Sequence, residues 1–110
     1  MGVGYLKTIG YRDTLDRLVV AFCRDYFFRK SAIESGEVSK RTRMEYEYIN
    51  GRIAEAAREI VGGDYEIYIE EIGEARGYAG SEVLTISEST YKQYKKEVKV
   101  NIAKKLHLLD

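Results

Sequence analysis

No proline occurs anywhere in the 110 residues, and this absence constrains the fold more than any other feature. Proline removes a backbone donor and breaks helix interiors. A chain without it can therefore form long helices, punctuated only by glycine and by capping residues. Hydrophobic residues make up 45% and charged residues 33%, a balance typical of soluble globular proteins. We expect one all-α domain over residues 1–110, a small bundle of three or four principal helices.

The first half of the chain predicts two helices. Apolar residues recur at three- and four-residue steps over 13–30, which favours an amphipathic helix. We expect a loop over 31–36, then a second helix that starts near Thr42, at capping-box spacing from a glutamate three residues later. The glycine pair beginning at Gly62 should end it. An Asn-Gly dipeptide at Asn50 is a turn signal, so a break there stays open.

The second half predicts a shorter helix and then the clearest one. Residues 64–76 alternate like a strand, but no second strand exists to pair with them, and so helix is expected. A glycine-bearing turn or short helix follows. Ser87 has the position of an N-cap for the last helix. Its apolar stripe steps by three and four residues through Tyr91, Tyr94, Val98, Ile102, Leu106 and Leu109.

Composition also excludes several functional classes. Cys23 is the only cysteine and His107 the only histidine, so neither a disulfide nor a zinc site with N and S ligands is expected. Catalysis would have to rest on carboxylates alone, and no phosphate-binding glycine loop is present. No run approaches the roughly 18 apolar residues that a membrane span needs, and the N-terminus lacks the pattern of a secretory signal. We therefore expect a cytoplasmic, non-enzymatic protein without cofactor, metal, membrane contact or small-molecule substrate.

Positive charge is concentrated in the last helix, although the whole chain has a net charge of zero. Residues 86–106 contain six lysines and two glutamates, which give a local charge of +4. Lysines that neutralise phosphates release counterions and so supply affinity for DNA, while short polar side chains near a helix start can contact bases. An ordinary solvated helix face would look similar. The candidate DNA contacts are Ser89, Thr90, Lys92, Gln93, Lys95, Lys96 and Lys99.

The order of residues in this segment, ISESTYKQYKKEVKVNIAKKL, adds a resemblance. It resembles the C-terminal half of helix-turn-helix domains in small phage-type transcriptional regulators and the related sigma-factor DNA-binding region. The resemblance extends over residues 69–109. It implies a helix-turn-helix-like unit at about 64–109, with Ser87 as the cap of the recognition helix. It also implies a DNA-binding regulator of phage or mobile-element type.

Two registers of that unit stay open. Such domains have a glycine-bearing turn of three or four residues before the recognition helix, but ten residues separate Gly77 from Ser87. In one register the turn is at Gly77 and the recognition helix starts near Ala79, which presents no lysine. In the other register Ser87 is the cap and the turn is long. Only the second register places the lysines at the start of a recognition helix.

The alternative function is a structural or protein-interaction module that self-associates as a helical bundle. The balance between the two functions depends on the partners of the lysines. Glu66, Glu70 and Glu74 lie four residues apart, on one helix face. Pairing of these acids with the last helix would use up its positive charge, whereas a divalent cation would need oxygen ligands that converge from several directions. Exposed lysines would instead favour DNA.

Overall fold

The computed structural model describes residues 10–83 and 85–109, and these form an all-α fold, as predicted. No strand occurs among the described residues. The α-helices in chain order are α2 (Asp13–Arg24), α3 (Tyr26–Ser35), α4 (Lys40–Val61), α5 (Tyr65–Gly73) and α6 (Glu88–Lys105). Two short 3₁₀ turns, η1 (Gly62–Asp64) and η2 (Tyr78–Gly80), flank α5.

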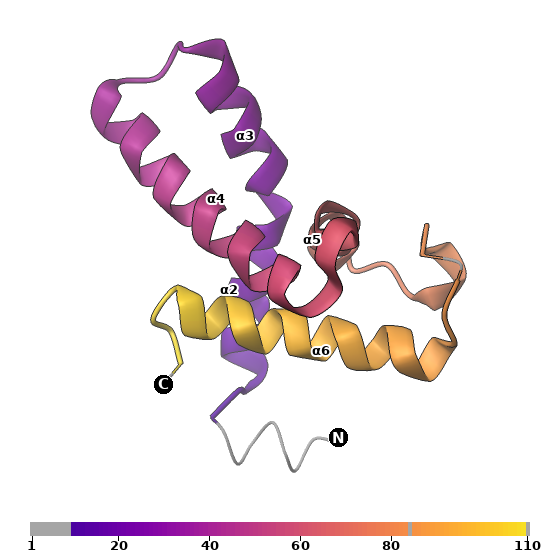
Figure 1. The fold of residues 1–110 in the computed structure, drawn as a ribbon. Helices are drawn as coiled ribbons and strands as arrows, with labels where there is room; N and C mark the ends of the chain where they lie inside the picture. The colour runs from indigo at the N-terminus through magenta and orange to yellow at the C-terminus, as the bar shows by residue number, and fades with distance from the viewer. Residues whose placement is uncertain (1–9, 84, 110) are drawn as a thin grey trace.

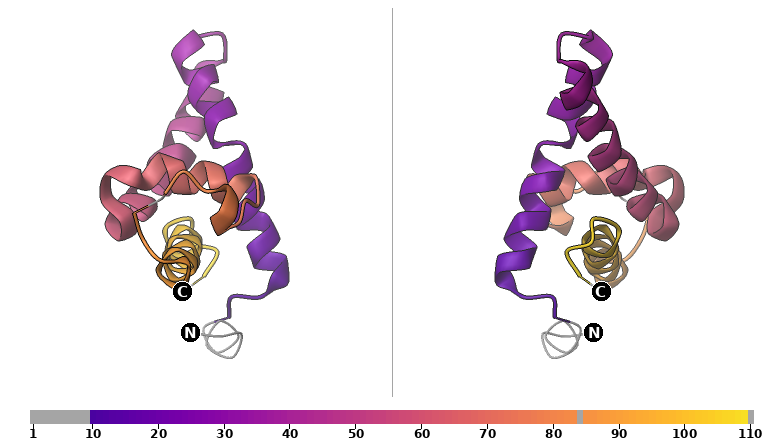
Figure 2. Two further views of the ribbon diagram at one scale, coloured as in Figure 1. Left: turned by 90° about the vertical axis from the view of Figure 1, so that its right-hand side faces the viewer. Right: turned by 90° about the vertical axis from the view of Figure 1, so that its left-hand side faces the viewer.

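Helix α6 is the centre of the packed body. It lies against α4 and α2, with smaller contacts to α5 and η2, and the other helices lie above and beside it when it is viewed along its axis (Figures 1 and 2). Val98 and Ile102 of α6 are fully buried together with Val19, Ile53 and Ile69 from the surrounding helices. The predicted apolar stripe of the last helix is thus the main core-forming surface.

The first predicted helix is bent, and the predicted loop over 31–36 is wrong. Asp25 separates α2 from α3 with a non-helical conformation, although its N–H still bonds back into α2. Helix α3 continues to Ser35 and ends at Gly36, which has a φ of 70°. Glycine adopts this left-handed conformation without steric cost and so provides the stop. Serine at helix positions 31 and 35 does not prevent this extension.

Helix α4 is continuous through its Asn-Gly dipeptide. It starts one turn earlier than the Thr42 signal indicated, because the hydroxyl of Ser39 caps it by accepting the Thr42 N–H at 3.2 Å. Asn50 remains helical because its side chain is used in the core. Its amide donates to the Tyr26 carbonyl at 2.9 Å, and its oxygen accepts from the buried Arg29 guanidinium at 2.7 Å. This buried pair fixes the bend between α2 and α3 against α4.

Helix α5 ends before the glycine that was expected to stop it. Ala75 takes the left-handed conformation with a φ of 55°, and the Arg76 N–H bonds to the Glu71 carbonyl at 2.9 Å. These contacts form a Schellman-type ending. Gly73, the last residue of α5, lies against the α2 backbone. A Cβ there would be 2.7 Å from the Cα of Arg24, so only glycine permits this close crossing.

The connection between α5 and α6 decides between the two registers. No recognition helix begins near Ala79, because residues 78–80 form only a single 3₁₀ turn. Instead Ser87 caps α6, and its hydroxyl accepts the Thr90 N–H at 3.3 Å. The Ser87 register is therefore correct for the start of the last helix. Fourteen residues, 74–87, join α5 to α6, and this connection is longer than the three- or four-residue turn of helix-turn-helix units.

Candidate functional site

Two of the lysines predicted to contact DNA are directed into the protein body. Lys95 donates to the Arg76 carbonyl at 2.6 Å, and its Nζ lies 5.3 Å from the centre of the Tyr91 ring. Burial, and secondarily the charge of Lys99, lower the pKa of Lys95. Lys99 forms an ion pair with Asp16 of α2 at 3.2 Å. Both side chains therefore join α6 to its neighbours.

The remaining predicted contacts lie at or near the N-terminal part of α6. Ser89 and Lys92 are exposed, and Lys92 lies 3.8 Å from Glu88, one turn earlier on the same helix. Exposed pairs of this kind contribute little to stability and leave the lysine accessible. The Thr90 hydroxyl contacts Ser87 at 3.0 Å. Two further side chains, Gln93 and Lys96, are partly exposed.

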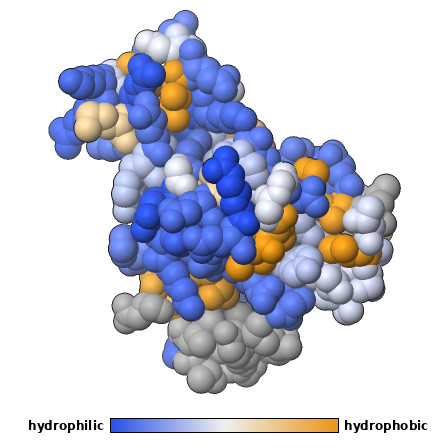
Figure 3. All heavy atoms as spheres, in the orientation of Figure 1, coloured by the Kyte–Doolittle hydropathy of each residue, from blue (hydrophilic) through white to orange (hydrophobic). Residues whose placement is uncertain are grey.

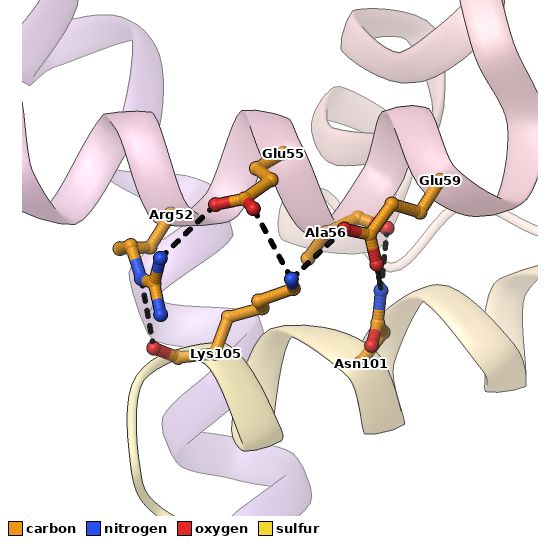
Figure 4. A network of polar contacts seen from close by, with 6 residues as sticks. All are labelled: Arg52, Glu55, Ala56, Glu59, Asn101 and Lys105. Carbon is orange, nitrogen blue, oxygen red and sulfur yellow. Dashed lines mark hydrogen bonds and ion pairs between the residues drawn. The ribbon is translucent and has the colours of Figure 1, made fainter.

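The C-terminal part of α6 is joined to α4 by a polar network (Figure 4). Lys105 lies 3.2 Å from Glu55 and 2.8 Å from Glu59. Asn101 donates to Glu59 at 3.0 Å, and Arg52 donates to the Lys105 carbonyl at 3.2 Å. Hydrogen bonds from Lys105 and Asn101 lower the pKa of Glu59. This end of α6 therefore faces α4, and Lys105 has two acidic partners there.

The acidic stripe pairs with other cations than the lysines of α6. Glu66 lies 2.8 Å from Lys30 on α3. Glu70 lies 3.2 Å from Arg76, which also forms an ion pair with Glu74. Within the described residues, no three His, Cys, Asp or Glu side chains gather where they could hold a metal ion. The pairing of these acids with Lys92, Lys95 or Lys99 is thus not found, since Lys92 pairs with Glu88, Lys99 pairs with Asp16, and Lys95 donates to the Arg76 carbonyl.

A buried carboxylate that sequence reasoning missed organises the long connection. Glu71 is 1% exposed and accepts three hydrogen bonds, from the Ser81 hydroxyl at 2.6 Å, the Tyr91 hydroxyl at 2.7 Å and the Glu82 N–H at 2.8 Å. Desolvation raises the pKa of Glu71, but these hydrogen bonds and the nearby Arg76 outweigh it, and the pKa is lowered. The available signal was its position three residues after the buried Tyr68.

Tyrosine rings fill a second, smaller core around this carboxylate. Tyr68 and Tyr91 are buried with ring centres 5.6 Å apart, and Tyr78 and Tyr94 pack around them. Burial raises the pKa of both Tyr68 and Tyr91 to about 12, so their hydroxyls stay protonated at neutral pH. The inward orientation predicted for the tyrosines of the last helix is confirmed. These rings are packed too deeply to stack on bases.

Exposed apolar side chains occur on the projecting hairpin of α3 and the first half of α4, where the Phe28 ring also packs edge-to-face against Tyr46. Phe28 is 66%, Met44 61% and Tyr48 53% exposed. From Lys30 to Ile49, all of which the structure describes, no residue is buried. Figure 1 shows this hairpin extending away from α6, and Figure 3 shows apolar surface among its hydrophilic side chains. We define Phe28, Met44 and Tyr48 as the hairpin surface.

The hairpin surface was not singled out from the sequence. Met44 and Tyr48 are one helical turn apart, so they share a face of α4. That face is opposite the buried Ile53, which belongs to the stripe facing the core. The signal was therefore present as two large side chains on the polar face of an amphipathic helix. A single apolar residue on a surface is common, however, and only the structure shows that residues 30–49 of the hairpin include no buried residue.

Comparison with protein-family models, with curated proteins and with solved structures found no significant match for this chain. In the part of the chain that the structure describes, no helix is both long enough and apolar enough to cross a membrane.

Proposed function

We propose that the protein is a non-enzymatic protein-interaction module that binds its partner through the hairpin surface. The observation that carries this proposal is the exposure of Phe28, Met44 and Tyr48 on two helices that bury no residue between 30 and 49. Helix pairs are normally stabilised by burying an apolar face. Exposed aromatic residues and methionine are also enriched at protein interfaces.

The charge on the hairpin fits recognition of a protein surface. Arg41 pairs with Glu45 at 3.5 Å and Arg43 with Glu47 at 2.8 Å, so positive and negative groups alternate beside Met44. A mixed rim around apolar side chains is typical of interfaces that form and dissociate. A nucleic-acid surface would instead carry mostly one sign of charge.

Site-specific photocross-linking in cells tests this proposal. Benzoylphenylalanine placed at Tyr48 should give a cross-linked protein adduct of defined mass, and Phe28 should give the same adduct. The control position is Ala79, which is exposed in η2 on a different part of the molecule. Adducts that are equally abundant at all three positions, or none at the hairpin, would refute the proposal.

DNA binding through the start of α6 is the second candidate, as the resemblance implies. It is favoured by the exposed Ser89 and Lys92, with Gln93 and Lys96 partly exposed beside them. Binding of phosphates by lysine must weaken as salt rises. Fluorescence anisotropy with duplex DNA at low and moderate salt should then show affinity that Lys92→Glu plus Lys96→Glu removes. The pairing of Lys95 and Lys99 inside the protein leaves a smaller patch than the sequence indicated.

A further inference from the structure

We infer that the partner of the hairpin surface is a second copy of this chain, bound with the two α4 helices antiparallel. This inference rests on the proposed function and names its partner. The contact is formed by the outer face of α4, which is opposite the core. Met44, Tyr48 and Gly51 lie at positions i, i+4 and i+7 and are all exposed, so they form one stripe along the helix.

The stripe permits close approach of another helix. The first three turns of α4, from Lys40 to Gly51, extend for about 18 Å at 1.5 Å per residue. Gly51 presents only backbone to the outside, and a Cβ built there would meet nothing within 4 Å. In an antiparallel pair centred on Met44, residues 40–48 of the two copies face one another, so Met44 and Tyr48 are the large side chains of the contact and Gly51 lies just beyond it. Methionine adapts its shape to such contacts because its side chain is unbranched.

The charges beside the stripe determine the orientation of the copy. On one side of the stripe Arg41 precedes Glu45 by four residues, and on the other side Arg43 precedes Glu47 by four residues. If two identical helices are antiparallel about Met44, each arginine lies near a glutamate of the copy. A parallel two-fold arrangement in register would instead bring Arg41 beside Arg43 of the copy and Glu45 beside Glu47 of the copy, which is unfavourable. The hairpin is thus complementary in charge to its own antiparallel copy.

Forming these contacts between copies costs little within each chain. The side chains of Arg41 and Glu45 are 92% and 61% exposed, and those of Arg43 and Glu47 are about half exposed. Solvent-exposed pairs contribute little to stability, so exchange of partners across a two-fold axis is nearly neutral. The contact is at the small end of protein interfaces, and so we expect a dimer with micromolar affinity.

Sedimentation velocity of the purified protein at about 10 to 500 µM, a range chosen to span micromolar affinity, tests the inference. We expect the sedimentation coefficient to rise with concentration from monomer to dimer. The double variant Arg41→Glu plus Arg43→Glu makes all four side chains acidic, and the dissociation constant should rise at least about tenfold. Glu45→Arg plus Glu47→Arg should do the same. The quadruple variant restores the complementarity, and dimerisation should return.

Two controls distinguish a loss of charge complementarity from a loss of folding. The quadruple variant keeps both pairs within the chain and places acids near the positive end of the helix, so it should fold at least as well as the native protein. Exchange of Glu88 and Lys92, an exposed pair of the same spacing on α6, should leave the dimer unchanged. If the quadruple variant and this exchange weakened the dimer to the same extent, the antiparallel arrangement would be overturned.

Failure of self-association and failure of the proposed function give different experimental results. A protein that remains monomeric at every concentration overturns the second-copy inference. If photocross-linking at Tyr48 then gives an adduct with a different protein, the interaction module stands without self-association. If Tyr48 gives no adduct in cells either, the proposed function fails as well.

Discussion

Replacement of Glu71 by glutamine should destabilise the protein by about 1–3 kcal/mol. The carboxylate accepts hydrogen bonds from two hydroxyls on one oxygen and from the Glu82 N–H on the other. With its amide turned toward the Glu82 N–H, glutamine would place two donors against each other. In the reverse orientation the Ser81 and Tyr91 hydroxyls can accept from the amide, but their own protons then lose their acceptor. One buried donor left unpaired costs roughly 1–3 kcal/mol, and the charge-assisted part of the remaining bonds is also lost.

The stability difference between the native protein and the Glu71→Gln variant should depend on pH in a definite direction. The folded protein holds the pKa of Glu71 below its ordinary value. A depressed pKa contributes stability that is fully present above the unfolded pKa, near 4.5, and that is lost as pH falls through the folded pKa. Urea unfolding followed by circular dichroism at pH 7 and at several pH values below 4.5 should therefore show the native protein and the Glu71→Gln variant converging as pH falls.

A neighbouring glutamate provides the control. Glu70 lies on the same helix, but its side chain is 42% exposed and paired with Arg76 at the surface. Glu70→Gln should change the free energy of unfolding by less than about 0.5 kcal/mol at pH 7. If Glu71→Gln also changed it by less than this amount, or if the difference did not diminish at low pH, the assignment of Glu71 as the organising carboxylate would be refuted.

Three further stability predictions and one chemical prediction use other features of the fold. Gly73→Ala should cost about 1–3 kcal/mol in chemical unfolding because a Cβ would overlap the α2 backbone, whereas Gly77→Ala, with nothing within 4 Å, should be close to neutral. Ala75→Gly should raise the unfolding free energy by about 1 kcal/mol, measured in urea, because it relieves a left-handed φ of 55°. Asn50→Ala should lower the thermal midpoint, since the Nε–H of the buried Arg29 loses its acceptor at a cost of about 1–3 kcal/mol, although the same guanidinium still donates to the Phe22 carbonyl. Burial raises the pKa of Cys23 to about 12, so a thiol reagent at pH 8 should label it only after denaturation.

The sequence predicts helices best where a capping residue and an apolar stripe agree. Ser87 and the stripe through Val98 and Ile102 together predicted α6, and the structure has both. The bend at Asp25 was not predictable in this way, because the apolar pattern continues across it. Its cause is the buried contact of Arg29 with Asn50, which joins residues that are 21 positions apart.

The end of α5 shows that tertiary contacts can move a helix end away from the glycine that the sequence indicates. Gly77 was the expected stop because glycine tolerates a left-handed conformation, yet Ala75 takes that conformation in the structure. The helix is held there by its close crossing with α2 at Gly73 and by the hydrogen bonds to Glu71. These tertiary contacts outweigh a local cost of about 1–2 kcal/mol for a non-glycine residue at positive φ.

The residue types of the candidate site could be predicted from the sequence, but the directions of their side chains could not. The lysines of α6 were correctly placed on a helix, but spacing alone could not show that Lys95 bonds to a carbonyl of the α5–α6 connection and Lys99 to an acid of α2. Long side chains reach several ångströms in any direction, so their partners depend on the packing of neighbouring helices. The hairpin surface required the same information, because the exposure of its side chains depends on which helices pack against the hairpin.

The absence of buried residues between 30 and 49 divides the molecule into two zones of local stability. Amide hydrogens in the packed body exchange with solvent only through openings near the global free energy of unfolding, whereas a segment with few buried contacts opens at lower cost. The hairpin beyond the Arg29 and Asn50 pair can therefore fray while α6 and its neighbours stay intact. Its helices would gain protection on binding, and that gain would appear as slowed exchange confined to the hairpin.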